Sequence, residues 1–212
     1  MTTLYAATSN AGKLREFALA ARLAGIDVLP LPGLDALPEP VEDAPTFSGN
    51  ADLKAVAYSL HAPGLLVFAD DSGLEVDALG GRPGIYSARF ADQLRFEPDA
   101  GLPRDERNNR CLLSLMRELQ RAGEGSVSRG ARFVCALSLA RNGTVLLRAE
   151  GTVEGELLDG PRGSGGFGYD PLFAVRRRGL TLAELTPDEK WAVSHRGNAF
   201  RSLLGQLTSA NL

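Results

Sequence analysis

Short apolar runs alternate with amphipathic stretches along the first half of the 212-residue chain. The apolar runs predict strands at 4–7, 26–29, 65–69 and 74–78. Apolar side chains at helical spacing predict helices at 13–24, 47–60 and 110–120. The apolar face of the first helix holds Leu14, Phe17, Ala18 and Ala21. Strands and helices that alternate in this way are typical of an α/β fold.

The second half of the chain predicts a hairpin followed by two helices. Residues 132–140 and 145–153 read as antiparallel strands, because Asn142-Gly143 between them favours a two-residue turn. A helix is expected to begin at Thr186-Pro187, since proline fits a first helical turn, and a last helix near Asn198. Irregular segments are predicted at 30–45 (with five prolines), 97–107 and 160–168 (rich in glycine). We can assign no role to the segment Phe96–Arg107.

The slight excess of acidic residues and the ordinary amino-acid composition limit the classes of function that the chain can have. The chain is 44% hydrophobic and 23% charged, which is typical of a globular protein. Its length fits one domain, with room for two lobes around a cleft. The net charge of −3 gives no broad attraction to nucleic acid, so a polyanionic substrate would need local cations or a metal ion.

Neither a zinc–sulfur site nor a membrane anchor is indicated. Cys111 and Cys135 lie far apart, without the spacing of a zinc site or a disulfide framework. No apolar run approaches the roughly 20 residues that span a bilayer, and the N-terminus lacks the pattern of a signal peptide. We therefore expect a cytoplasmic protein without a membrane partner.

The segment from Thr8 to Lys13 lies between a predicted strand and a predicted helix and reads Thr8-Ser9-Asn10-Ala11-Gly12-Lys13. Hydroxyl and amide side chains cap helix N-termini, where free N–H groups and the helix dipole favour an anion. Lys13 adds a full positive charge, so the segment indicates a phosphate site. It is not a Walker A loop, because Ala7 and Leu14 stand where that motif needs glycine and a hydroxyl residue. The alternative is an ordinary helix cap beside a solvated lysine.

Two adjacent aspartates, Asp70 and Asp71, are predicted at the end of the apolar strand 65–69. Their repulsion and their loss of hydration are costly without a counter-ion. Neighbouring side chains of a strand point to opposite faces, so one aspartate would enter a cleft while the other supports it. Ligands bind at strand ends in open α/β sheets, and Mg²⁺ prefers carboxylate oxygens. The alternative is an aspartate-rich turn.

The glycine-rich segment Gly163–Gly168 matches the G-x-G-x-x-G fingerprint of dinucleotide-binding folds. That fingerprint follows a strand and opens a helix, whereas Gly160-Pro161-Arg162 precedes this segment and Tyr169-Asp170-Pro171 prevents a helix. We therefore reject the dinucleotide interpretation. An aromatic residue in such a loop can stack on a base, although the glycines could also serve only to relieve strain.

Three further positions carry weak signals on their own. Glu42, in the proline-rich loop, and Lys54, on the following helix, would ordinarily be solvated. Ser194-His195-Arg196-Gly197 could offer hydrogen-bond donors to a ligand, but a lone histidine is more often structural. No G-x-S-x-G elbow supports a nucleophilic triad.

Five segments together resemble the inosine/xanthosine triphosphate pyrophosphatase family, whose members cleanse purine nucleotide pools. These segments are 7–13, 69–74, 78–89, 165–171 and 194–197. They occur in the family's order and extend over nearly the whole chain, which is far more specific than any single motif. One departure is Ala44, which stands where the family pattern Glu-x-Gly-x-Thr-Phe has glycine, two residues after Glu42.

The resemblance implies an elongated mixed β-sheet flanked by helices, two lobes around a central nucleotide cleft, and a homodimer. It implies hydrolysis of the α–β phosphoanhydride of inosine, deoxyinosine and xanthosine triphosphates (ITP, dITP, XTP), giving the monophosphate and pyrophosphate. Asp71 would accept the proton of the attacking water, and Glu42 and Asp71 would hold Mg²⁺. The substrate would contact Thr8, Ser9, Asn10, Ala11, Gly12, Lys13, Lys54, Asp70, Ser72, Phe167, Gly168, Tyr169, Asp170, Lys190, His195 and Arg196.

Two other functions stay open at this point. A nucleotide pyrophosphatase of the related Maf type would act on modified or pyrimidine triphosphates. A nucleotide-binding module would use the same residues without hydrolysis, although the aspartate pair argues against it.

Overall fold

The computed structural model describes residues 2–23, 25–97, 101–123 and 126–210. It divides into two compact units. The first unit holds Met1–Ser72, Val134–Thr152 and Trp191–Leu212, and the second holds Gly73–Phe133 and Val153–Lys190. The strands form a mixed six-stranded sheet in the order β2-β1-β3-β4-β5-β6, which confirms the predicted α/β class. The cleft expected between two lobes stays a prediction.

The first unit begins with parallel strands joined by helices. Strand β1 (Thr3–Ala6) pairs in parallel with β2 (Asp27–Pro30) and with β3 (Val67–Val76). Helix α1 (Ala11–Leu23) connects β1 to β2, and α2 (Phe47–Leu60) lies between β2 and β3, after the short helix η1 (Leu34–Ala36). Parallel neighbours need such crossovers, because a tight turn cannot bring the chain back to the same edge.

The predicted hairpin is present. Strands β4 (Gly130–Arg141) and β5 (Thr144–Leu157) are joined by Asn142-Gly143. Both turn residues have positive φ, 53° at Asn142 and 77° at Gly143. This left-handed backbone is what the favoured two-residue turn requires, and it explains why asparagine and glycine stand there.

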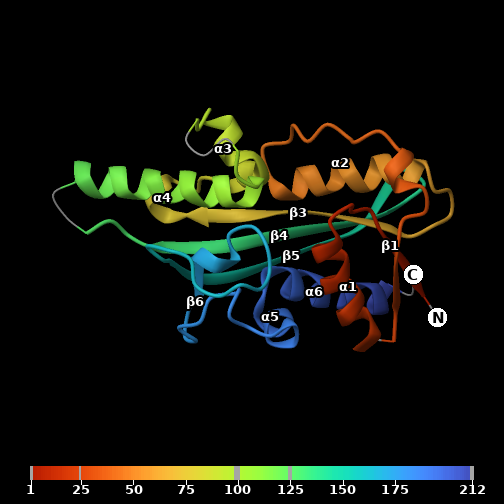
Figure 1. The fold of residues 1–212 in the computed structure, drawn as a ribbon. Coiled ribbons are helices and arrows are strands. Elements are labelled where there is room, and N and C mark those ends of the chain that lie inside the picture. The colour runs from red at the N-terminus through yellow and green to blue at the C-terminus, as the bar shows by residue number, and fades with distance from the viewer. Residues whose placement is uncertain (1, 24, 98–100, 124–125, 211–212) are drawn as a thin grey trace. The chain divides into compact units, whose positions relative to one another are not determined.

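Two apolar cores lie on opposite faces of the first unit's strands, where Figure 1 shows the helices that cover them. Helices α1 and α6 (His195–Ala210) pack on one face, and α2 packs on the other. Strand β3 contributes to both cores by alternation, because Phe68 belongs to the α1/α6 core while Val67 and Ala69 belong to the α2 core. The residues that follow Ala69 continue the same alternation.

Four aromatic rings fill the centre of the α1/α6 core. Phe17 meets Phe68 edge to face with ring centroids 5.1 Å apart, and Phe200 lies 5.3 Å from Phe17 and 5.7 Å from Phe68. Trp191 closes the cluster 6.0 Å from Phe200. Such pairs are favourable beyond the area that they bury. The α1 and α6 backbones are therefore held firmly against β3.

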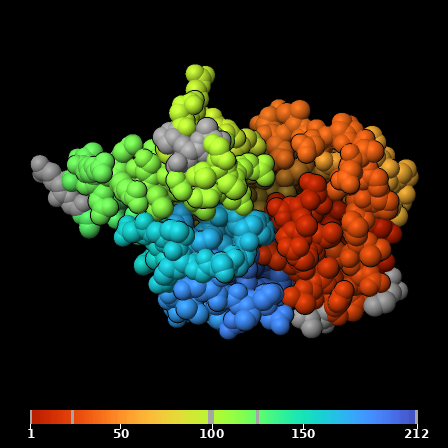
Figure 2. All heavy atoms as spheres, in the orientation of Figure 1, coloured from red at the N-terminus to blue at the C-terminus, as the bar shows by residue number. Residues whose placement is uncertain are grey.

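The second unit combines a long helix with short irregular elements. Helix α4 (Arg104–Ala122) buries Leu112 and Met116, and β6 (Phe173–Val175) pairs antiparallel with β5. The other short elements are η2 (Asp77–Leu79), η3 (Gly84–Arg89), α3 (Phe90–Gln93) and η4 (Asp170–Leu172). Helix α5 (Pro187–Val193) begins at the predicted proline in the second unit and ends in the first. In the space-filling view, the cyan surface around residues 158–170 lies beside the yellow-green surface at the start of α4 (Figure 2).

Two predicted boundaries in the middle of the chain were wrong. The expected strands 65–69 and 74–78 are one strand, β3, so Asp70 and Asp71 lie inside a strand instead of at its end. Contacts with residues that are distant in the sequence keep this backbone extended, although the local sequence favours a turn. Helix α4 begins at Arg104, not Arg110, because Pro103 precedes it and Asp105 and Glu106 favour the positive end of the dipole. Part of the segment 97–107 (residues 98–100) lies outside the described residues.

Other helix starts also differ from the predictions. Helix α6 begins at His195 instead of near Asn198, since the Ser194 hydroxyl oxygen accepts a hydrogen bond from the Gly197 N–H at 3.1 Å. Helix α1 begins at Ala11, two residues before Lys13, and its predicted end at Ala24 lies outside the described residues. The bounds of α2 are as predicted, and its N-cap is Thr46, whose side chain accepts a hydrogen bond from the Gly49 N–H.

Cys111 and Cys135 are both free thiols and buried. Within the part of the chain that the structure describes, no helix is both long enough and apolar enough to cross a bilayer.

We predict that the aromatic cluster controls the stability of the first unit. Phe68→Ala should lower the free energy of unfolding by about 3–5 kcal/mol, because it removes a ring that is 1% exposed and leaves a cavity. Urea denaturation followed by circular dichroism measures the change. Val41→Ala is the control, since Val41 is 74% exposed and should change stability by less than about 0.5 kcal/mol. Equal losses in the two variants would contradict the packing described here.

Candidate active site

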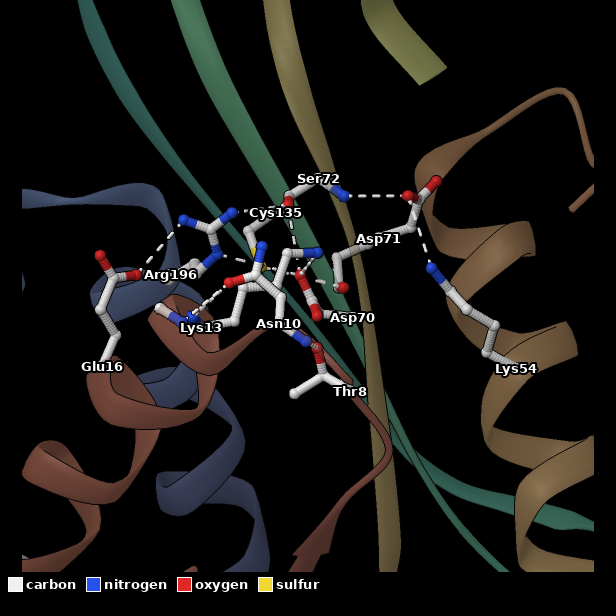
Figure 3. A network of polar contacts seen from close by, with 12 residues as sticks. Thr8, Asn10, Lys13, Glu16, Lys54, Asp70, Asp71, Ser72, Cys135 and Arg196 are labelled. Atoms are coloured by element: carbon white, nitrogen blue, oxygen red, sulfur yellow. Dashed lines mark hydrogen bonds and ion pairs between the residues drawn. The ribbon is translucent and has the colours of Figure 1, made fainter. Parts of the chain in front are cut away.

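The two aspartates of β3 leave the strand on opposite faces, as the sequence predicted. Both are buried, Asp70 at 4% and Asp71 at 7% exposure. Asp70 follows the register of Phe68 toward α1 and α6, whereas Asp71 follows Val67 and Ala69 toward α2 (Figure 3). Because β1 ends at Ala6, which pairs with Phe68, the aspartates lie just beyond the end of the neighbouring strand.

Asp70 is the acceptor for two cations. Its Oδ2 lies 2.8 Å from Lys13 Nζ and 3.9 Å from Arg196 Nε. The Ser72 hydroxyl donates a third contact to the same oxygen at 3.2 Å. Burial raises the pKa of Asp70, but Lys13 and Arg196 outweigh burial and lower the pKa from 3.8 to about 2. Asp70 is therefore a permanently charged counter-ion near neutral pH.

Lys13 is placed by the capped N-terminus of α1. Asn10 Oδ1 accepts hydrogen bonds from the N–H groups of Gly12 (2.9 Å) and Lys13 (3.1 Å), and Thr8 Oγ1 accepts from the Asn10 N–H (3.2 Å). The N–H groups expected to be free for an anion are thus partly satisfied by Asn10. The lysine ammonium and the helix dipole remain as the attraction for a phosphate at this end of α1.

Arg196 lies on the first turn of α6, beside the buried His195. Its Nη2 donates to Ser72 Oγ at 3.1 Å, and its Nη1 lies 3.3 Å from Glu16 Oε2 (Figure 3). Gly197 cannot carry a side chain, because a Cβ there would collide with the Trp191 carbonyl oxygen. The tight connection between α5 and α6 therefore fixes where Arg196 enters the network.

Asp71 faces a different set of partners on α2. Asn50 Nδ2 donates to its Oδ2 at 3.1 Å, and the Ser72 N–H donates to its Oδ1 at 3.1 Å. Lys54 Nζ lies 3.6 Å from Asp71 Oδ1. Burial raises the pKa of Asp71 above its usual 3.8, and the opposing effects of Lys54 and Asn50 do not cancel it. The two neighbouring carboxyl groups therefore have pKa values displaced in opposite directions.

Glu42 and Asp71 share the ammonium group of Lys54. Lys54 Nζ lies 3.2 Å from Glu42 Oε2, so one cation bridges the proline-rich loop and β3. Burial lowers the pKa of Lys54, but Asp71, Asp70 and Glu42 outweigh burial and raise it. Within the described ranges, no group of three or more histidine, cysteine or acidic side chains could hold a metal ion. The donor set of Glu42 and Asp71 nevertheless fits Mg²⁺, which proteins usually hold through one or two carboxylates together with substrate phosphates.

Asn50 is a residue of this site that the sequence analysis did not assign. Its side chain is fully buried, with Oδ1 accepting from the Ala44 N–H at 3.0 Å while Nδ2 donates to Asp71. It therefore links the loop that carries Glu42 to the strand that carries Asp71. The signal for it in the sequence is weak: a polar residue among small and apolar residues at the start of the helix.

In the second unit, the aromatic glycine loop (Gly163–Asp170) gathers around Asp170. Asp170 Oδ2 accepts from the Phe167 N–H and from Lys190 Nζ, both at 2.8 Å. Lys190 Nζ also lies 4.9 Å from the centroid of the Phe167 ring. Gly166 must be glycine, because a Cβ there would collide with the Asp170 carboxylate. No α-helix follows the loop, in agreement with the rejection of a dinucleotide fingerprint.

Comparison with known proteins identifies the family to which these residues belong. The model of the Ham1 family matches residues 4–206. The chain belongs to the Ham1 family. This confirms the family that the five sequence segments indicated.

Individual Ham1-family members resemble the chain over its whole length. A relative from Acidobacterium capsulatum, named dITP/XTP pyrophosphatase, is 51% identical over 205 residues, covering 97% of this chain and 98% of its own. The solved HAM1 protein from Coxiella burnetii is 34% identical, with a TM-score of 0.81 over 99% of this chain and 100% of that one. The Ham1 protein of Staphylococcus aureus is 36% identical, with a TM-score of 0.77 over 99% and 100%.

Ala44, the departure from the family pattern, has a local explanation. The residue packs beside Gly49, where an added Cβ would lie only 2.7 Å from the Ala44 Cβ. The extra methyl group of Ala44 is therefore accommodated by the absence of a side chain at position 49. The Ala44 N–H still donates to Asn50, so the loop keeps its connection to Asp71.

The structure brings most of the predicted polar residues into two groups. In the first unit, one network joins Lys13, Glu42, Lys54, Asp70, Asp71, Ser72 and Arg196. Thr8 and Asn10 shape the start of α1, with exposed Ser9 and Ala11 and half-buried Gly12 beside them. In the second unit, Phe167, Asp170 and Lys190 lie together, adjacent in sequence to Gly168 and Tyr169. The roles of these residues stay predictions.

We predict that Asp70 stabilises the fold in a pH-dependent way. Its folded-state pKa of about 2 is below the ordinary 3.8, so the stabilisation is complete above about pH 5 and is lost as the pH falls toward 2. The free energy of unfolding of Asp70→Asn should therefore be about 2 kcal/mol lower than that of the wild type at pH 7. The difference in unfolding free energy between the two proteins, the gap that the experiment measures, should be smaller at pH 3. Urea titrations at the two pH values measure it, with exposed Asp43→Asn as the control. A gap that does not depend on pH would exclude this role.

Proposed function

We propose that the chain hydrolyses non-standard purine nucleoside triphosphates (ITP, dITP and XTP) to the nucleoside monophosphate and pyrophosphate. The name of the relative from Acidobacterium capsulatum, which matches over nearly its full length, supports this reaction. The observation that carries the proposal is the network of the first unit. It gathers the cations that a triphosphate needs around Asp70, and beside them a second carboxylate, Asp71, whose pKa is raised.

The reaction assigns the proton to Asp71. A water molecule attacks the α-phosphorus, and the bond from that phosphorus to the bridging oxygen breaks. The bridging oxygen leaves with the electron pair as part of pyrophosphate, and the proton of the water passes to the Asp71 carboxylate. A raised pKa suits this role, because a more basic carboxylate accepts a proton more readily. Asn50 and the Ser72 N–H would orient that carboxylate toward the water.

The triphosphate is assigned to the cations of the first unit. Lys13 and Arg196 supply positive charge, and the segment Thr8–Gly12 supplies polar groups at the start of α1. Asp70 holds both cations in place before the substrate arrives, so little reorganisation is needed on binding. Lys54 and Ser72 would also contact the substrate.

Glu42 and Asp71 would hold Mg²⁺. The ammonium of Lys54 lies between these carboxylates, which indicates that they can share a cation. When bound, Mg²⁺ supplies neutralisation of the charge that develops on the leaving pyrophosphate.

The purine is assigned to the aromatic glycine loop and to the hydrogen-bond donors that the family resemblance named. The Phe167 ring offers a stacking surface, and Gly168, Tyr169 and Asp170 would contact the nucleoside. Hypoxanthine and xanthine carry a 6-oxo acceptor, so donors from Lys190, His195 or Arg196 would pair with them. Adenine carries an amino donor at this position, and each donor of the protein that is left without an acceptor costs roughly 1–3 kcal/mol. Rejection of guanine requires a further interaction that disfavours its 2-amino group.

We extend the proposal to a homodimer, which the family resemblance implied, and to a cytoplasmic location without a nucleic-acid or membrane partner, which the sequence led us to expect.

A substrate panel tests the activity itself. We expect release of pyrophosphate from ITP, dITP and XTP in the presence of Mg²⁺ and little release without it. ATP should react at least about tenfold more slowly, since one lost hydrogen bond has about that effect on an equilibrium. GTP and pyrimidine triphosphates complete the panel, with pyrophosphate detection as the readout. Comparable turnover of ATP and ITP would refute the specificity, and a preference for pyrimidine triphosphates would favour the Maf-type alternative.

The role of Asp71 has its own prediction. Asp71→Asn should lower kcat by about 10²- to 10⁴-fold, because the amide cannot accept the proton. The variant should still fold and bind ITP, as measured by circular dichroism and calorimetry. Asp43→Asn makes the same chemical change on the exposed part of the Glu42 loop and should keep wild-type turnover. Near-normal turnover in Asp71→Asn would remove Asp71 from the mechanism.

A further inference from the structure

The first two turns of α4 hold the backbone of Gly168 from both sides. Asp105 Oδ2 accepts a hydrogen bond from the Gly168 N–H at 2.8 Å. Asn109 Nδ2 donates a hydrogen bond to the Gly168 carbonyl oxygen at 3.0 Å. The two side chains are four residues apart and therefore lie on one face of the helix. Both polar groups of a single loop residue are thus bound by one rigid element.

The two hydrogen bonds from Asp105 and Asn109, which we call the clamp on Gly168, are needed because of the conformation of Gly168. Its φ is +61°, although a Cβ there would meet no atom within 4 Å, so glycine is required by the backbone angle and not by space. A left-handed residue outside any helix or strand has no regular backbone partners, so Asp105 and Asn109 supply them. Without these two bonds the loop would retain the freedom that glycine allows.

The residue that follows Gly168 is fixed through the same region. The Tyr169 hydroxyl donates to the Ser87 carbonyl oxygen at 2.9 Å. Asn108, the neighbour of Asn109, donates to the carbonyl oxygens of Ser87 (3.3 Å) and Ala88 (3.1 Å). Tyr169 and Asn108 are 4% and 3% exposed, so these bonds are sheltered from water. The start of α4 therefore anchors the aromatic glycine loop at two consecutive residues.

Phe167 is the residue whose position depends on this anchoring. It directly precedes Gly168, its N–H donates to Asp170, and its ring is only half-buried beside Lys190. The direction of the ring depends on the backbone that carries it as well as on its contact with Lys190. The clamp on Gly168 therefore restricts the direction in which the ring faces.

We propose that Asp105 and Asn109 are positioning residues that hold Phe167 in the orientation needed to stack on a purine base. This inference rests on the proposed function, and it gives a role to the end of the segment 97–107, for which the sequence suggested none. Neither residue would touch the substrate. Loss of either bond should weaken recognition of the base and leave the binding of phosphate groups unchanged.

Four substitutions separate the hydrogen bonds from the shape of the side chains. Asn109→Asp keeps the size but replaces the donor with an acceptor that faces the Gly168 carbonyl oxygen. Asp105→Ala removes the acceptor, and Asp105→Asn restores it, because an amide oxygen can still accept from the Gly168 N–H. Gln120→Glu makes the same amide-to-acid change as Asn109→Asp at an exposed position of α4 and serves as the matched control.

Steady-state kinetics with ITP, inhibition by inorganic tripolyphosphate and hydrogen exchange of a peptide spanning 164–172 give the readouts. Asn109→Asp and Asp105→Ala should each raise KM for ITP about tenfold, with kcat within about twofold of the wild type. The Ki of tripolyphosphate, which has no base, should not change. Exchange in the peptide should accelerate, whereas Asp105→Asn and Gln120→Glu should behave like the wild type.

Each contrary result has a distinct meaning. Faster exchange with an unchanged KM would overturn the positioning role, since the clamp would then hold the loop without affecting the base. Equal weakening of ITP and tripolyphosphate would overturn it as well, because the effect would not be specific to the base. If Asn109→Asp does not fold, the pair Asp105→Ala and Asp105→Asn decides the question alone. A wild type that hydrolyses no purine triphosphate would instead overturn the proposed function.

Discussion

The alternation of side chains along β3 is the constraint on which the candidate site depends. Residues 67 to 71 send successive side chains to opposite faces, so the strand that separates two apolar cores also separates two carboxylates. Asp70 continues the face of Phe68 and meets the cations of α1 and α6. Asp71 continues the face of Ala69 and meets Asn50 and Lys54 of α2. A shift of one residue in the register of β3 would exchange these surroundings.

Opposite surroundings give the two carboxyl groups opposite properties. Asp70 is surrounded by positive charge and loses its proton readily, so it serves as a fixed counter-ion that orders Lys13 and Arg196. Burial instead makes Asp71 a better proton acceptor, and its neighbours orient it without removing that effect. Pairs of acidic groups whose environments displace their pKa values in different directions are typical of catalytic sites. The aromatic packing of Phe17, Phe68 and Phe200 holds α1 and α6 against β3, so stability and site geometry have a common origin.

Local patterns in the sequence predicted the parts of the fold that local interactions determine. The spacing of apolar residues gave the bounds of α2, and Asn142-Gly143 gave the hairpin turn. The continuity of β3 could not be read in this way, because Asp70-Asp71-Ser72-Gly73 is turn-like on its own and is held extended by partners elsewhere in the chain. The same applies to Asn50 and to Asp105, whose partners lie 21 and 63 residues away. The family motifs suggested the remaining candidate residues, but the contacts among those residues depend on the three-dimensional fold.

The most direct test of the central claim is a carbon-detected NMR titration of the aspartate carboxyl groups, with Asp70→Asn and Asp71→Asn used to assign the two signals. The arrangement on β3 predicts that Asp70 titrates near 2 and that Asp71 titrates above the ordinary value of 3.8. Two signals that titrate together, or in the reverse order, would contradict the separation of the two carboxylates by the pleat of β3.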